Sequence, residues 1–91
     1  MTNILIAYDL HKLGQRYQGL RAHIKQTFPT HWACLDSAFI VKTSLNVAQV
    51  RDSCLPHLDS NDDLLVVHLA PQTWATWGFS EGCINWLKAH C

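Results

Sequence analysis

The chain has 91 residues, of which 48% are hydrophobic and 15% charged, and its seven basic and seven acidic residues give a formal net charge of zero. This length is that of one domain. The absence of any run of Lys or Arg argues against a strongly basic nucleic-acid binder, although a few arginines focused on one face would still be compatible with nucleic-acid binding.

The N-terminal part predicts a strand followed by a helix. Residues 3–9, NILIAYD, indicate a central strand that is apolar on both faces and ends at an acid. Apolar side chains then recur at spacings of four, three, four and four, which predicts one face of an amphipathic helix that ends at Pro29. The members of this stripe are Leu13, Tyr17, Leu20, Ile24 and Phe28.

The middle of the chain predicts two strands and a second helix. Residues 32–43, WACLDSAFIVKT, are rich in strand-forming residues, and the polar pair Asp36 and Ser37 marks a turn between two strand segments. Ser44 is the expected N-cap of the second helix. Pro56 is expected to distort the last turn of that helix, because a proline removes a backbone hydrogen bond.

The C-terminal part completes the predicted fold. The polar cluster 59–63, DSNDD, predicts a turn before a buried strand at 64–69, LLVVHL. The resulting β-α-β-β-α-β order predicts an α/β (α+β) ferredoxin-like sandwich for residues 1–70, with both helices on one face of the sheet. Residues 71–91, a Trp-rich segment and a short helix capped by Ser80, form an appendage of the same single domain that packs on this core or across a dimer.

The same patterns lead to expectations about the compartment. The first apolar run is short, follows no basic region and is interrupted by Asp9, and no segment reaches the ~20 apolar residues of a membrane span, so we expect neither a signal peptide nor a membrane helix. A cytoplasmic location then predicts free thiols, used as small apolar fillers, at Cys34, Cys54, Cys83 and Cys91. Cys54 and His57 have a C-x₂-H spacing, but no paired C-x₂-C motif supports a zinc site.

Asp9 is the first candidate for chemistry. Side chains at the carboxyl end of a central strand often line a functional crevice, but such an aspartate also serves as a turn or helix-cap residue. As a ligand it would suit Mg²⁺ or Mn²⁺. A single carboxylate is too little for a metal site, so the site would require a second Asp9 across a twofold axis. His11, two residues further on, would act as a general acid or base or be a solvent-exposed loop histidine.

Several short motifs carry a resemblance. The strand ending in YDL, with Arg16 opening the next helix, resembles the start of the CRISPR-associated small adaptation subunit family. DSAFIV resembles the Ser-small-Phe signature of that family through Ser37, Ala38 and Phe39, and DSNDD followed by LLVVHL occupies the corresponding place. The resemblance covers about residues 3–70. The chain is also similar to the virulence-associated protein D family of ribonuclease-like toxins.

The resemblance implies a ferredoxin-like homodimer with Mg²⁺- or Mn²⁺-dependent endonuclease activity on RNA or DNA. Asp9 would then be the metal-binding acid and Arg16 the basic residue near the substrate backbone. Ser37 and Phe39 would lie next to the site at the dimer interface. An integrase is the implied partner for the adaptation family and an antitoxin for the toxin family. The neutral net charge and the Trp-rich tail depart from the family pattern.

A second hypothesis is a non-catalytic dimeric module that binds nucleic acid or a partner protein, because this fold class serves many functions. The aromatic residues of the tail would stack on bases. No basic residue lies among the first three, Trp74, Trp77 and Phe79, so this stacking would lack an electrostatic partner. Packing on the open sheet face or across a dimer is therefore the favoured interpretation for Trp74, Trp77, Phe79 and Trp86. Arg21 and Lys25 are expected to be solvated charges beside the apolar stripe of the first helix.

Overall fold

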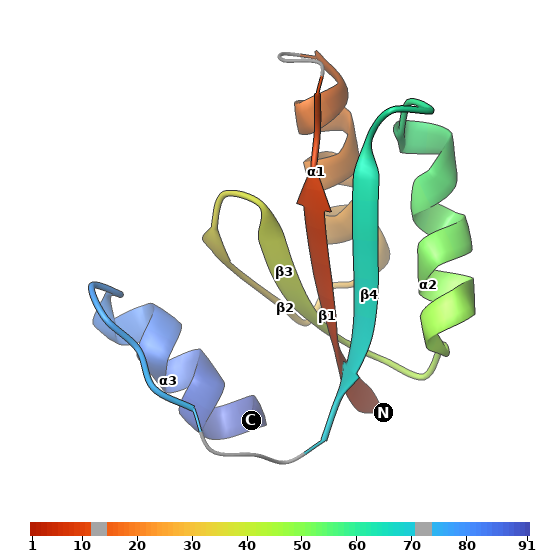
Figure 1. The fold of residues 1–91 in the computed structure, drawn as a ribbon. Coiled ribbons are helices and arrows are strands. Elements are labelled where there is room, and N and C mark those ends of the chain that lie inside the picture. Colours follow the sequence, from red (N-terminus) through yellow and green to blue (C-terminus); the bar gives the residue numbers. More distant parts are fainter. Residues whose placement is uncertain (12–14, 71–73) are drawn as a thin grey trace.

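The fold is a four-stranded antiparallel sheet with helices on both faces (Figure 1). The computed structural model describes residues 1–11, 15–70 and 74–91. The sheet order is β2-β3-β1-β4. The βαββαβ order confirms the predicted α+β class, with a C-terminal helix added. The elements are β1 (Thr2–Asp9), α1 (Gln15–Thr27), β2 (His31–Leu35), β3 (Ala38–Thr43), α2 (Val47–Cys54), the 3₁₀ helix η1 (Leu55–His57), β4 (Asp63–Leu69) and α3 (Glu81–His90).

One face of the sheet is covered by α1 and α2. Because side chains alternate along a strand, Ile4, Ile6 and Tyr8 of β1 all point to this face, where each is buried. Figure 1 shows α1 and α2 together on one side of the sheet, with α3 apart from them. The core on this side consists of Ile4, Ile6, Tyr8, Leu20, Ile24, Phe28, Phe39, Val41, Val50 and Cys54.

The second helix begins two residues later than expected. Asn46, and not Ser44, is the N-cap of α2. The amide nitrogen of Gln49 donates to Asn46 Oδ1 at 2.8 Å, and the amide nitrogen of Asn46 donates to Gln49 Oε1 at 2.9 Å. Such a reciprocal capping box satisfies two helix-end donors at once, which Ser44 would not achieve because Val47 stands three residues after it.

Arg21 connects α1 to the turn between β2 and β3. Its Nη1 donates to the backbone oxygen of Asp36 at 2.8 Å and to the hydroxyl of Tyr8 at 3.0 Å. The guanidinium carbon also lies 4.8 Å from the ring centroid of Phe39, in cation–π contact. The expectation of a solvated charge is therefore wrong for Arg21, whereas Lys25 is exposed.

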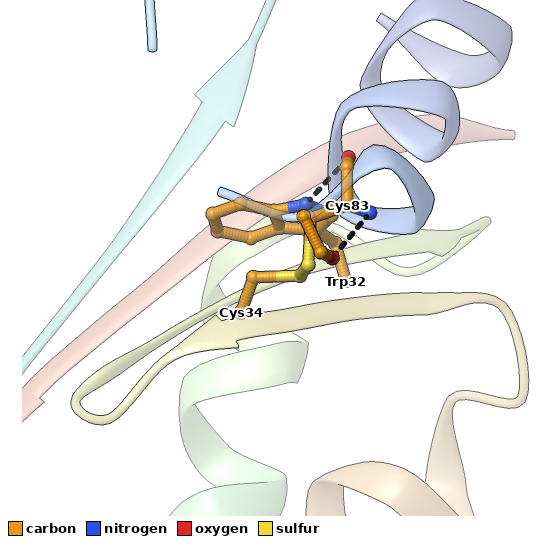
Figure 2. Close-up of a disulfide and its surroundings, with 4 residues drawn as sticks. Trp32, Cys34 and Cys83 are labelled. Carbon is orange, nitrogen blue, oxygen red and sulfur yellow. Dashed lines mark hydrogen bonds between the residues drawn. A yellow bond between two sulfur atoms is a disulfide. The ribbon is translucent and has the colours of Figure 1, made fainter. Parts of the chain in front are cut away.

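The other face of the sheet is partly covered by α3, which a disulfide ties to β2. Figure 2 shows the bond between Cys34 and Cys83, whose Cα atoms are 6.2 Å apart. The indole nitrogen of Trp32 donates to the backbone oxygen of Cys83 at 3.1 Å in the same view. The expectation of four free thiols is wrong for these two cysteines, because the packing of α3 over β2 brings together residues 49 positions apart. Cys54 and Cys91 are free.

Aromatic side chains of the C-terminal part form a second core. Phe79 meets Trp32 edge to face, with ring centroids 5.2 Å apart. Trp77, in contrast, is 95% exposed, so it does not pack on the sheet within this chain, and its packing across a dimer stays a prediction. The second core contains Trp32, Ile40 and Leu87, with Leu5, Cys34, Leu69, Trp74, Phe79, Cys83, Trp86 and Cys91 packed against it. None of the helices in the described parts of the chain has the length and apolar character that spanning a bilayer requires.

Candidate functional site: a carboxylate–imidazole group at the end of the sheet

Two strand ends place two aspartates side by side. Asp9 is the last residue of β1 and Asp63 the first residue of β4, and the antiparallel register sets them directly opposite each other. Alternation along β1 places both side chains on the sheet face opposite to α1 and α2. Like charges in directly opposed positions destabilise a sheet, so this pair needs a compensating positive charge.

His11 completes a group of three side chains. Its Nε2 lies 3.1 Å from Oδ2 of Asp63, and the two side chains are 45% and 76% exposed. With Asp9 included, the three residues offer donor atoms that all lie within 4.8 Å of one another. The group therefore combines two carboxylates and one imidazole at a solvent-accessible position, and all of its members come from one chain. We refer to Asp9, His11 and Asp63 below as the strand-end group.

Asp62 positions this group through the backbone. One oxygen of its carboxylate accepts a hydrogen bond from the amide nitrogen of His11 at 2.9 Å. The other oxygen accepts from the amide nitrogen of Asp59 at 2.8 Å, which closes the turn before β4. Asp62 thus fastens the segment after β1 to the turn before β4.

The carboxylates stabilise the charged form of the imidazole. The hydrogen bond to Asp63 is the main cause that raises the pKa of His11 above its ordinary value. Desolvation, the next cause in size, lowers this pKa, and the negative charges of Asp9, Asp63 and Asp62 raise it. The neighbouring carboxylates therefore favour the protonated imidazole of His11 at this position.

The strand-end group borders an open, mainly apolar hollow. This hollow has a volume of about 270 Å³ and is lined by Ala7, Tyr8, Asp9, Asp63, Leu64 and Leu65. Leu65 is 58% exposed, which is high for a leucine in a sheet. α3 contacts the opposite end of β1, where the side-chain nitrogen of Asn3 donates to the backbone oxygen of His90 at 2.6 Å. Figure 1 accordingly shows α3 away from the strand ends that carry Asp9 and Asp63.

The residues proposed from the resemblance lie in different environments. The backbone oxygen of Ser37 accepts from the amide nitrogen of Tyr8 at 3.0 Å, which places exposed Ser37 near the end of β1. Phe39 is 0% exposed and lies in the core beneath the helices, on the sheet face opposite to Asp9. Arg16 belongs to α1, but its side chain lies outside the described part of the structure.

Asp63 is the residue that sequence reasoning missed. It stands in the cluster DSNDD, for which the sequence predicts a turn and a place among the motifs of the resemblance, but no role of an individual acid. Because β1 and β4 are antiparallel neighbours in the ferredoxin-like strand order, the end of β1 meets the start of β4. This order, applied to the predicted strands, would have paired the acid after the first strand with the acids before the last.

The fold and the strand-end group define the class to which this protein belongs. It is an α+β protein of ferredoxin-like element order that carries an exposed carboxylate–imidazole group at one end of its sheet. Neither a protein-family model nor a curated protein matches this chain.

Proposed function

We propose that this protein is a metal-dependent endonuclease that hydrolyses phosphodiester bonds in RNA or DNA. The observation that supports this proposal is the strand-end group, in which donor atoms of Asp9, His11 and Asp63 lie within 4.8 Å of one another. Carboxylate oxygens are the preferred ligands of Mg²⁺ and Mn²⁺ in proteins. The motifs around Asp9, Ser37 and Phe39 point to the same chemistry by resemblance.

The residues of the group have distinct roles in this proposal. When bound, a divalent cation stabilises charge on the phosphate and lowers the pKa of a coordinated water. Asp9 and Asp63 would hold that cation from the adjacent strands β1 and β4. His11 would act either as a third ligand of the cation or as a proton carrier. Asp62 holds the backbone of His11 in place.

The charge of the site defines how a substrate can approach. The carboxylates of the group repel a phosphate backbone unless a cation lies between them and the substrate. Arg21 has its guanidinium directed at the turn between β2 and β3, which leaves Arg16 at the start of α1 as the basic residue proposed for the substrate backbone. The neutral net charge predicts weak binding of nucleic acid in EDTA and stronger binding with Mn²⁺.

A homodimer is part of this proposal. The hollow that Ala7 and Leu65 line lies beside the strand-end group, on the part of the sheet that is far from α3. A second copy packed over this hollow would bury Leu65 and bring two strand-end groups close to each other. The partner of the dimer would be an integrase or an antitoxin, according to which of the two families the chain resembles in function.

A cleavage assay tests the proposal. Labelled single-stranded RNA and double-stranded DNA are incubated with the parent protein and with Asp9→Asn, each with Mg²⁺, with Mn²⁺ and with EDTA. We expect metal-dependent cleavage by the parent and its loss in Asp9→Asn. Asp52→Asn is the matched control, because Asp52 is an exposed acid of α2 that pairs with Arg51 at 2.8 Å. Cleavage by Asp9→Asn at the rate of the parent contradicts the proposal.

The second candidate function is a non-catalytic module that holds nucleic acid or a partner protein. The observation that favours it is Trp77, whose side chain is 95% exposed. A fully exposed tryptophan is costly in water and is often found at binding surfaces. Under this hypothesis Trp77→Ser abolishes nucleic-acid binding measured by fluorescence anisotropy, whereas Asp9→Asn leaves that binding unchanged and no cleavage is detected with any protein.

A further inference from the structure

We propose that the strand-end group is a complete metal site within a single chain, and that His11 is its third ligand. This ligand set would select ions that bind imidazole well, such as Mn²⁺, Fe²⁺ or Co²⁺, over Mg²⁺. The inference rests on the proposed function for its use of a cation, and it goes beyond that function by assigning the ligands, the stoichiometry and the class of ion.

The distances support a site in one chain. Ligand atoms about 2.1 Å from an ion lie about 3.0 to 3.4 Å apart when they are neighbours in an octahedral or tetrahedral shell. The contact between His11 Nε2 and Asp63 Oδ2, 3.1 Å, already matches such an edge. All three donor atoms lie within 4.8 Å of one another, so side-chain shifts of roughly 1 to 2 Å at most, which exposed carboxylates can make by rotation, would bring them to such spacings.

The backbone fixes the three ligands from two directions. Asp9 and Asp63 are held by the β1–β4 ladder, in which they are directly opposed. His11 is held by the hydrogen bond from its amide nitrogen to Asp62 at 2.9 Å. Asp62 contacts two backbone nitrogens, so it acts as a positioning residue behind the ligands.

Electrostatics supply the reason for a cation. The opposed carboxylates of Asp9 and Asp63 repel each other across the ladder, and a divalent ion between them would convert this repulsion into attraction. In the described parts of the chain, neither carboxylate forms an ion pair with a lysine or an arginine.

The imidazole determines the class of ion. Mg²⁺ prefers oxygen ligands and retains its waters, whereas nitrogen ligands bind first-row transition metals with increasing affinity from Mn²⁺ to Co²⁺. A site with two carboxylates alone would discriminate little between Mg²⁺ and Mn²⁺. A site that includes His11 would show a clear preference, and this preference would disappear with the imidazole.

Metal titration tests this assignment without any need for activity. Isothermal titration calorimetry of the parent with Mg²⁺, Mn²⁺ and Co²⁺ should give one ion per chain, with Co²⁺ and Mn²⁺ bound roughly 10- to 100-fold more tightly than Mg²⁺. His11→Ala should reduce this preference to less than about threefold. His68→Ala is the matched control, since His68 is an exposed histidine further along β4, and it should bind as the parent does.

Pulsed electron paramagnetic resonance of bound Mn²⁺ gives a second readout. We expect coupling to an imidazole nitrogen in the parent and in His68→Ala, and none in His11→Ala. If the parent binds Mg²⁺ and Mn²⁺ with equal affinity, and His11→Ala changes neither affinity, His11 is not a ligand. The proposed function would still stand in that case if cleavage requires Asp9. A stoichiometry of one ion per two chains would overturn the single-chain site. If none of the three ions binds the parent, both this inference and the metal-dependent function are wrong.

Discussion

The disulfide between Cys34 and Cys83 gives the prediction with the largest effect on stability. It closes a loop with a sequence separation of 49, for which the chain-entropy relation gives about 4 kcal/mol of stabilisation at 25 °C, within a usual range of about 2 to 4 kcal/mol. A domain of 91 residues gains roughly 0.19 kcal/mol/K of entropy on unfolding. The double variant Cys34→Ser/Cys83→Ser should therefore melt roughly 10 to 20 °C below the parent.

The assay compares thermal unfolding of the oxidised parent, the reduced parent and the double variant by far-UV circular dichroism. Near-UV signals are recorded in parallel, because Trp32 donates to the backbone of Cys83 and should report on the release of α3. Cys91→Ser is the matched control, since Cys91 is free and half-buried. Its melting temperature should stay within a few degrees of that of the parent.

Two results would refute this reasoning. In denaturant, the oxidised protein should contain two titratable thiols, those of Cys54 and Cys91. Four titratable thiols in protein purified without reductant would mean that the bond does not form. Equal melting temperatures of the oxidised and reduced parent would mean that the bond does not stabilise the folded chain.

Three further predictions follow from individual contacts. Asp9→Asn in EDTA at pH 8 should raise the melting temperature by about 1 to 5 °C, because it removes repulsion from Asp63; a decrease would contradict this argument. Burial, and secondarily the stacked ring of His57, lowers the pKa of His23. The unfolded state then binds more protons, so the free energy of unfolding decreases as the pH falls through 6.5. A nuclear magnetic resonance titration of His23 should give a midpoint below 6.5, and this midpoint should rise in His57→Asn. A midpoint at or above 6.5 in the parent would contradict the lowered pKa. Trp32→Phe should reduce the free energy of unfolding in urea by about 1 to 3 kcal/mol through loss of its hydrogen bond and of packing volume, and an unchanged free energy would show that this contact contributes nothing.

The sheet and its helices follow from local patterns in the sequence. The alternation around Ile4, Ile6 and Tyr8 and the apolar stripe containing Leu20 and Ile24 each match one structural period, and these residues form the core. The N-cap of α2 was misplaced, although the sequence contained the signal. Asn46 is followed three residues later by Gln49, and this spacing is typical of a capping box.

The parts that local patterns could not predict depend on contacts between distant segments. Cys34 and Cys83 carry no spacing signal, and their pairing follows only from the packing of α3 over β2. The strand-end group is similar, because Asp9 and Asp63 become neighbours only through the β1–β4 ladder. The motifs around Asp9 therefore indicate one carboxylate, whereas the fold brings together two carboxylates and an imidazole.

A Mn²⁺ titration tests whether one chain holds a divalent cation between the ends of β1 and β4. The signal of free Mn²⁺ in electron paramagnetic resonance is followed for the parent, Asp63→Asn and Asp52→Asn. We expect one bound ion per chain for the parent and for Asp52→Asn, and an affinity at least about tenfold weaker for Asp63→Asn. Equal Mn²⁺ binding by the parent and Asp63→Asn would contradict the account.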